Sequence, residues 1–243
     1  MLGKSKVKYI QSLGQKKLRD EEGLFIAEGP KIIPELLASA DTHIQEMYAL
    51  REWLDEHAAK IKDIEVTEVS EIELGRISQL STPNQVLAVV KKFEPPVIDA
   101  RGTVSLMLDG IQDPGNVGTI VRIADWFGLG QVICSRDCAD IYNPKVVQAT
   151  MGSIARIKVL YTDLAEWLDL QQGINIYAAS LDGEDIATIK KITQGIIVIG
   201  NESKGISAEI MNKTSNKITI PRKGHAESLN AAVAAGIILS HIV

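Results

Sequence analysis

Short apolar runs alternate along the chain with stretches of helical periodicity, which predicts an α/β fold. In the second half, several runs are apolar at successive positions, as expected of strands buried on both faces of a parallel sheet. The predicted strands of this half lie at 104–108, 131–134, 157–160, 174–179, 196–199 and 217–220. Helices are predicted between or after them at 117–127, 144–151, 163–170 and 229–242. This half therefore predicts an α/β domain built on a parallel sheet.

The first half has the same alternation with shorter elements. Helices are predicted at 6–19 and 31–39, and strands at 24–27, 47–50, 64–69 and 85–90. A charged, proline-rich sequence follows at 91–96 and is typical of a connector between domains. We therefore predict a small α/β domain at 1–92, a linker at 93–100 and the larger domain at 101–243.

The net charge of the 243 residues is −5, which argues against a chain that binds polyanions over its whole surface. The charge is uneven, however, because six basic residues precede the first acidic one, Asp20: Lys4, Lys6, Lys8, Lys16, Lys17 and Arg19. Two interpretations remain open at this point. The run is either the solvated face of an amphipathic helix or a surface that contacts phosphate and releases counterions.

The only two cysteines, Cys134 and Cys138, provide neither a disulfide framework nor a second Cys/His cluster at zinc spacing. This favours a reducing, cytoplasmic location and predicts no metal site. The first residues lack the apolar core of a signal peptide, and no run approaches the ~20 apolar residues that cross a bilayer. We therefore expect no membrane association.

Polar side chains follow three predicted strands of the larger domain. After the first, a turn rich in glycine and proline leads to Asn116, a candidate N-cap of the next helix. Arg122 and Asp125 lie off the apolar stripe of that helix. They could form an intrahelical ion pair, or Arg122 could bind a phosphate beside the carboxyl end of the strand.

The second and third polar segments are also ambiguous when each is taken alone. Glu202 lies in the sequence Gly-Asn-Glu-Ser-Lys-Gly at 200–205, which is either a surface turn or a ligand-binding loop. Ser228 is a candidate N-cap, with Asn230 just inside a helix of small and apolar residues. None of the glycine-containing turns matches a phosphate-binding loop or a dinucleotide fingerprint. This weakens the interpretation as an ATPase, a GTPase or an NAD-dependent oxidoreductase.

Together, the three segments resemble the motifs of the SpoU (TrmH) family of RNA ribose 2′-O-methyltransferases, within the SPOUT superfamily. The first motif has an asparagine and, six residues later, an arginine, here Asn116 and Arg122. The second is a strand ending in Gly-Asn-Glu at 200–202, with a glycine shortly after. The third is a strand ending in Ile-Pro, then Ser-Leu-Asn at 228–230 and an alanine-rich helix. The resemblance covers about 104–240, and 8–29 resembles the family's small RNA-binding domain, similar to a ribosomal protein fold.

The resemblance implies a fold, an activity and partners. The fold would be a parallel-sheet, trefoil-knotted SPOUT methyltransferase domain preceded by a small α/β RNA-binding domain. The activity would be methylation of a ribose 2′-hydroxyl with S-adenosylmethionine as cofactor and no metal, and the chain would be a homodimer. The RNA-binding domain favours ribosomal RNA. The alternatives are a tRNA 2′-O-methyltransferase and a non-catalytic RNA-binding factor in ribosome assembly.

The resemblance also implies roles for individual residues. Residues expected at the catalytic site are Arg122, Asn116, Ser228, Asn230 and Glu202. Residues expected to bind the cofactor are Gly200, Ile220, Leu229, Ala179 and Ser180. Residues expected to contact RNA are Lys8, Lys16, Lys17 and Arg19, so the resemblance favours the phosphate-binding interpretation of the basic run.

Overall fold

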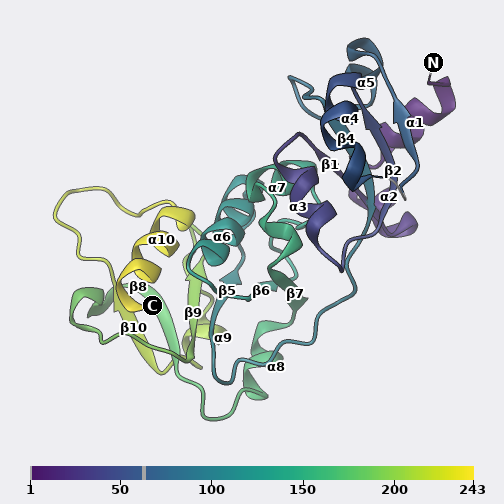
Figure 1. Cartoon of the computed structure of the whole chain (residues 1–243). Coiled ribbons are helices and arrows are strands. Elements are labelled where there is room, and N and C mark those ends of the chain that lie inside the picture. Colours follow the sequence, from purple (N-terminus) through teal and green to yellow (C-terminus); the bar gives the residue numbers. More distant parts are fainter. Residues whose placement is uncertain (1, 62–63) are drawn as a thin grey trace. The chain divides into compact units, whose positions relative to one another are not determined.

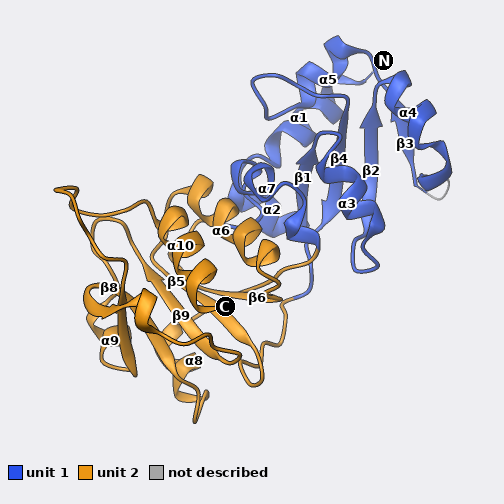
Figure 2. Cartoon of the chain, turned by 60° about the vertical axis from the view of Figure 1, so that its left-hand side comes forward, with its two compact units in different colours: residues 1–94, 140–155 blue, residues 95–139, 156–243 orange. Residues whose placement is uncertain are grey.

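The computed structural model describes residues 2–61 and 64–243, which form two compact units (Figures 1 and 2). The first unit contains the chain up to Glu94 together with Asp140–Ala155, and the second contains Pro95–Ala139 and Arg156–Val243. The chain thus first passes between units inside the predicted linker 93–100. The segment 140–155, however, packs with the first unit although it lies inside the larger predicted domain. The predicted domain limits themselves stay a prediction.

The first unit is a four-stranded mixed sheet in the order β1-β4-β2-β3, in which only the β2/β3 pair is parallel. Its strands are β1 (Leu24–Glu28), β2 (Ile44–Ala49), β3 (Val66–Glu68) and β4 (Val86–Lys91). Its helices from the first half of the chain are α1 (Lys4–Ser12), α2 (Lys16–Glu22), α3 (Ile32–Ala38), α4 (Arg51–His57), the 3-10 helix η1 (Ala58–Lys60) and α5 (Glu71–Ile77). The segment 140–155 adds α7 (Pro144–Thr150) and the 3-10 helix η2 (Ser153–Ala155). Every residue of β1 is buried, because elements cover both faces of the sheet there.

The prediction of one helix over 6–19 is wrong, because the chain breaks between α1 and α2 at 13–15. The carbonyl groups of Leu13 and Gly14 accept hydrogen bonds from the Arg19 guanidinium, at 3.1 and 2.8 Å. These bonds satisfy carbonyls that a continuous helix would have paired internally. Helices α4 and α5 were not predicted. Ser70 and Glu73 form a capping box at the start of α5, which is a readable signal of a helix start.

The second unit is a six-stranded sheet in the order β10-β8-β9-β5-β6-β7, with every pair parallel. Its strands are β5 (Val104–Asp109), β6 (Gln131–Ser135), β7 (Lys158–Thr162), β8 (Ile176–Asp185), β9 (Gly195–Gly200) and β10 (Asn216–Thr219). Its helices are α6 (Pro114–Trp126), α8 (Leu164–Asp169), the 3-10 helix η3 (Ile186–Thr188), α9 (Ala208–Met211) and α10 (Ala231–Ile242). The predicted parallel α/β architecture, with a smaller α/β unit before it, is confirmed.

Helices cover both faces of this sheet (Figure 1). On one face, Trp167 of α8 and Ile210 of α9 belong to a buried cluster with Met107, Ile133 and Ile196 of the central strands. On the other face, α6 contacts β6 and α10 contacts β9, and the two helices pack against each other. Continuous burial of β5 and β9 therefore follows from their central place in a sheet covered on both sides.

Two predicted helix caps are wrong, and both corrections bear on the site. Helix α6 begins at Pro114, and its N-cap is Asp113, whose carboxylate accepts from the backbone N–H of Asn116 at 2.8 Å. The N-cap of α10 is Asn230 rather than Ser228, and its side-chain oxygen accepts from the N–H groups of Ala232 and Val233. Among residues 2–61 and 64–243, no helix has the length and apolar content needed to span a bilayer.

Candidate active site

The carboxyl ends of the six parallel strands lie at one edge of the second sheet, and the three polar segments begin there. Strand β5 leads through residues 110–113 into α6, while β9 leads into 200–205. The loop 220–230 follows β10 and leads into α10. Because β5 and β9 are neighbours and α6 packs against α10, segments far apart in the sequence can meet at this edge.

A hydrogen-bond network joins one residue from each polar segment. Asn116 donates through its side-chain amide to the carboxylate of Glu202. Its side-chain oxygen accepts from Nδ2 of Asn230 at 2.8 Å. Asn116 and Glu202 are half-buried, whereas Asn230 is exposed. The structure thus brings together three of the five predicted catalytic residues.

The loop after β9 is tightly closed on itself. The backbone N–H of Asn201 donates to the carbonyl of Gly205 at 3.1 Å, and the reverse bond is 2.8 Å long. A methyl group on Gly200 would lie 2.4 Å from the backbone carbon of Gly205 and the nitrogen of Ile206. Gly200 is one of the residues expected to bind the cofactor, and the backbone that approaches it most closely belongs to this loop.

The loop after β9 is also tied to the loop after β5. Asn201 donates through Nδ2 to the carbonyl of Gly110 at 2.7 Å, and its Oδ1 accepts from the N–H groups of Ser203 and Lys204. Asp109, the last residue of β5, accepts from the N–H of Ser207 at 2.7 Å. These bonds hold Glu202 close to the start of α6.

The end of β6 supports the loop after β5 from the other side. The hydroxyl of Ser135 accepts from the N–H of Gly110 at 2.9 Å, and Sγ of Cys138 accepts from the N–H of Ile111 at 3.3 Å. Several interactions lower the pKa of the Cys138 thiol to about 7, and the hydrogen bond with Cys134 is the largest of them. Both cysteines are buried and free. Cys138 supports the β5–α6 loop through its hydrogen bond with Ile111, and Cys134 lies in β6.

The loop that follows β10 is open to solvent. All residues from 221 to 230 are exposed, and the backbone from 221 to 229 makes no backbone–backbone hydrogen bond within the described chain. Leu229 is 45% exposed. Ser228 has no hydrogen-bond partner among the described residues, so the structure does not join it to the network around Asn116. Ile220 is half-buried.

The remaining predicted cofactor residues lie where β8 leaves its partner strand. Lys217 pairs with Ala178 but the next residue, Ile218, pairs with Glu184, so residues 179–183 stand outside the ladder. The hydroxyl of Ser180 donates to Asp182, which also receives a 2.9 Å hydrogen bond from Lys217. These two donors, Lys217 first, lower the pKa of Asp182 to about 2. Ala179 and Ser180 are half-buried.

Arg122 is exposed on α6 and has no hydrogen-bond or ion-pair partner among the described residues. The alternative of an intrahelical pair with Asp125 is wrong, because Asp125 binds Arg156, with 2.7 Å between Oδ2 and the guanidinium. The Arg122 guanidinium therefore remains available to bind an external group.

The predicted RNA contacts divide into two kinds. Lys8, Lys16 and Lys17 are exposed, and Lys17 lies 3.8 Å from Glu21 in an i,i+4 pair. Arg19, in contrast, is only 1% exposed and its guanidinium is occupied within the first unit. Its side chain is not displayed to an RNA, so we remove it from the contact set. The described residues contain no group of three or more His, Cys, Asp or Glu side chains placed to hold a metal ion.

Comparison with known proteins assigns both parts of the chain. Residues 103–240 match the family model described as the SpoU rRNA Methylase family. The chain belongs to the SpoU rRNA methylase family. Residues 4–88 match a second model, described as the MRM3-like substrate binding domain.

Full-length relatives of this SpoU-family chain are known. It is 31% identical to the 23S rRNA (guanosine(2553)-2′-O)-methyltransferase RlmP of Bacillus subtilis, over 98% of this chain and 95% of the relative. An AdoMet-bound rRNA methyltransferase from Sinorhizobium meliloti is 31% identical, with a TM-score of 0.89 over 99% of this chain and 95% of that one. A TrmH-family protein from Porphyromonas gingivalis is 36% identical, with a TM-score of 0.85 over 99% and 98% of the two chains. The predicted family, methyltransferase activity and S-adenosylmethionine cofactor are confirmed.

Sequence reasoning missed several residues that build the SpoU site. Asp113 caps α6, and the signal was Pro114 at the first helical position, where proline is favoured. Asn201 and Asp109 tie the two central loops together. Both are polar residues directly at the carboxyl ends of buried strands, which is where such a signal is expected.

Proposed function

We propose that this chain transfers a methyl group from S-adenosylmethionine to a ribose 2′-hydroxyl of ribosomal RNA. The observation that carries the proposal is the network in which Asn116 binds both Glu202 and Asn230. It joins three loops at the carboxyl edge of a parallel sheet, where open α/β proteins bind their ligands. Arg122, on the same helix as Asn116, adds an exposed cation with no partner in the described chain.

The loops at this edge fit the cofactor. S-adenosylmethionine supplies, when bound, an electrophilic methyl group on a sulfonium. The backbone of 221–229 has free hydrogen-bonding groups, and the exposed side chain of Leu229 offers apolar surface for an adenosyl group. We assign cofactor binding to these groups and to Gly200, Ile220, Ala179 and Ser180.

The catalytic residues have separate tasks in this proposal. Arg122 holds the phosphate next to the target ribose, and its positive charge stabilises the 2′-oxygen as the hydroxyl proton passes to solvent water. A guanidinium stays protonated in proteins, so its contribution is charge and orientation. Asn116, Asn230 and Ser228 position the ribose and the cofactor. Glu202 fixes the amide of Asn116 and thereby the geometry of the network.

The choice of ribosomal RNA rests on the N-terminal part of the chain. The match of residues 4–88 to a substrate binding domain and the names of the full-length relatives both support it. The tRNA alternative and the non-catalytic alternative become outcomes of the test below. The predicted cytoplasmic location is part of this proposal, because ribosomal RNA lies in the cytoplasm of bacteria such as those from which the relatives come.

The test is methyl transfer from S-adenosylmethionine with a labelled methyl group to deproteinised ribosomal RNA. We expect labelled dinucleotides that resist alkaline hydrolysis, because a 2′-O-methyl group blocks cleavage of the adjacent phosphodiester. Alkali-labile labelled mononucleotides would mean base methylation and would contradict the proposal. Transfer of label to tRNA offered in a parallel reaction, with none to ribosomal RNA, would favour the tRNA alternative. Absence of any heat on titration with S-adenosylmethionine would favour a non-catalytic RNA-binding protein.

Replacing Lys16 and Lys17 by glutamine is expected to weaken RNA binding and reduce its salt dependence. Each lost phosphate contact lowers the slope of log K against log[salt] by about 0.7–0.9. The matched control replaces Arg51 and Lys60, two exposed cations elsewhere in the first unit, and should leave the slope unchanged. Filter binding over a range of salt concentrations gives the slope. Equal slopes in both double variants would mean that Lys16 and Lys17 do not contact RNA. The proposed RNA contact of the neighbouring Lys8 would then be abandoned as well.

We also propose that two copies of the chain associate through α6 and α10, which pack against each other. Trp126 of α6 is 83% exposed and Val233 of α10 is 50% exposed, so this helix pair displays large apolar side chains. Sedimentation velocity at micromolar concentration should give a dimer, and a stable monomer would contradict the proposal. The trefoil knot implied by the resemblance stays a prediction.

A further inference from the structure

The segment Asp140–Ala155 belongs by sequence to one unit and by packing to the other. It connects β6 to β7 of the methyltransferase sheet, yet it forms part of the first compact unit (Figure 2). The chain therefore crosses between the units at three peptide bonds, 94–95, 139–140 and 155–156. The segment is thus joined covalently to the second unit at both of its ends while it packs within the first.

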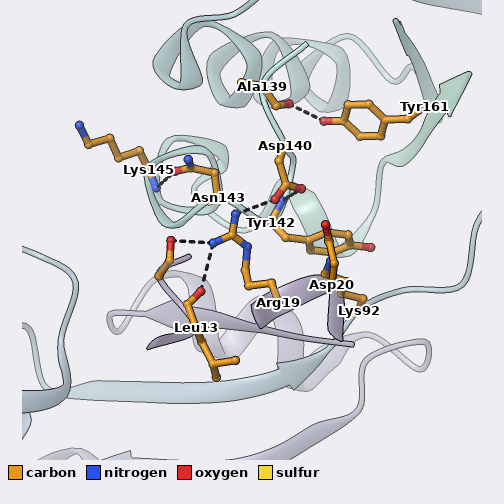
Figure 3. Close-up of polar contacts among 11 residues, drawn as sticks. Leu13, Arg19, Asp20, Lys92, Ala139, Asp140, Tyr142, Asn143, Lys145 and Tyr161 are labelled. Atoms are coloured by element: carbon orange, nitrogen blue, oxygen red, sulfur yellow. Dashed lines mark hydrogen bonds and ion pairs between the residues drawn. The ribbon is translucent and has the colours of Figure 1, made fainter. Parts of the chain in front are cut away.

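A buried ion pair fixes the first end of this segment (Figure 3). The Arg19 guanidinium donates to Oδ2 of Asp140 at 2.7 Å, and their side chains are 1% and 14% exposed. The same guanidinium donates to the carbonyls of Leu13 and Gly14. The second oxygen of Asp140 accepts from the N–H of Tyr142 at 3.0 Å. Arg19 thus joins the turn between α1 and α2 to the start of the segment.

Aromatic and polar contacts extend the attachment. The Tyr142 ring lies 5.0 Å from the ring of Phe25 in β1, and its hydroxyl accepts from the N–H of Phe93 at 3.0 Å. At the far end of the segment, the hydroxyl of Ser39 donates to the carbonyl of Ala155 at 3.3 Å. The segment is therefore held to the first unit near both of its ends.

The residue before Asp140 is held just as firmly in the second unit. The N–H of Ala139 donates to the carbonyl of Ile111 at 2.9 Å, and its carbonyl accepts from the hydroxyl of Tyr161 at 2.5 Å. Ile111 lies in the loop between β5 and α6, two residues before the cap of the helix that carries Asn116 and Arg122. One peptide bond therefore separates an anchor in the RNA-binding unit from a support of the catalytic loop.

Burying an ion pair is seldom the best way to stabilise a fold, because desolvation offsets much of the attraction. The Nε of Arg19 is moreover buried without a hydrogen-bond partner in the described chain. We propose that Arg19 and Asp140 are positioning residues for methyl transfer. They anchor the start of the 140–155 segment in the first unit, and through the single peptide bond to Ala139 they hold the loop after β5 in the geometry that methyl transfer needs. This inference rests on the proposed function.

The decisive variant is Asp140→Asn, which keeps the side-chain size and removes the charge opposite Arg19. We expect single-turnover methyl transfer at saturating ribosomal RNA to fall about tenfold or more, since small misplacements of reacting groups are that costly. The dissociation constants for RNA and for S-adenosylmethionine should change less than about twofold, because neither binding surface is altered. Hydrogen exchange should become faster at the amides of 140–155 and at Ala139.

The matched control is Glu46→Gln, which breaks the 2.7 Å pair with Lys6 in the same unit without touching the 140–155 segment. It should transfer methyl groups at the wild-type rate. Tyr142→Phe, which removes only the hydroxyl bound to Phe93, should reduce the rate in the same direction by less. If the Asp140→Asn protein does not fold, the rate of the Tyr142→Phe protein tests the proposal in its place.

A wild-type rate in the Asp140 or Tyr142 variant at saturating RNA would overturn the inference. So would an equal loss in the Glu46 control, or a loss confined to RNA affinity, because each would leave the ion pair a merely structural or RNA-binding role. Failure of the proposed function would be recognised separately, since the wild-type protein itself would then transfer no methyl group to RNA.

Discussion

Replacing Arg122 by alanine is expected to lower the rate of methyl transfer by about 10²–10³-fold, the usual effect of losing one group that stabilises charge in the transition state. The guanidinium is exposed on α6, the helix that also carries Asn116, and has no partner in the described chain. Its loss therefore removes the proposed contact to the substrate without opening a cavity. Binding of S-adenosylmethionine, measured by calorimetry, should change less than about twofold, as for other surface substitutions.

The matched control for this prediction is Arg101→Ala. Arg101 is 78% exposed, binds Asp99 at 2.7 Å and precedes β5, so it lies toward the opposite edge of the sheet. It should transfer methyl groups at the wild-type rate. Unchanged methylation of the true RNA by the Arg122 variant would remove the arginine from the mechanism. Loss of cofactor binding in that variant would instead assign it to the cofactor site.

The strands of the methyltransferase sheet were predictable because burial on both faces requires apolar residues at successive positions of the sequence. Each central strand is a run of apolar residues, and β5 and β9 are buried along almost their whole length. The sequence also indicates where such strands end. Asn116, Glu202 and Asn230 could therefore be identified as polar residues near one edge of the sheet. The network that joins them could not, because it depends on strand order and on the packing of α6 against α10.

Contacts between distant segments account for most of the errors. Arg19 stands in a basic run and looks like its neighbours, but its partner Asp140 lies 121 residues later. Asp125 was paired with Arg122 within one helix, yet it binds Arg156. The helix at 144–151 was predicted from its own sequence, but its packing on β1 depends on residues more than 100 positions earlier in the chain. Local pattern identifies elements, and long-range pairing decides what each side chain does.

Gly200→Ala is expected to destabilise the methyltransferase unit and to abolish most cofactor binding. The added methyl group would lie 2.4 Å from backbone atoms of Gly205 and Ile206, and backbone cannot rotate away as a side chain can. The hydrogen bonds between Asn201 and Gly205 hold that backbone in place. We expect a loss of about 1–3 kcal/mol in the free energy of unfolding, as for other overpacked sites. If displacement of the loop costs about 1.4 kcal/mol of binding free energy, the affinity for S-adenosylmethionine falls tenfold.

Gly130→Ala provides the comparison, because no atom lies within 4 Å of a methyl group added there. Its unfolding free energy should stay within about 0.5 kcal/mol of the wild type, and its cofactor affinity should not change. Thermal unfolding and calorimetry measure both quantities. If Gly200→Ala is destabilised but binds S-adenosylmethionine normally, the loop after β9 supports the fold without contacting the cofactor. The proposed cofactor site would then reduce to the loops after β8 and β10, where the exposed backbone of 221–229 is the remaining candidate.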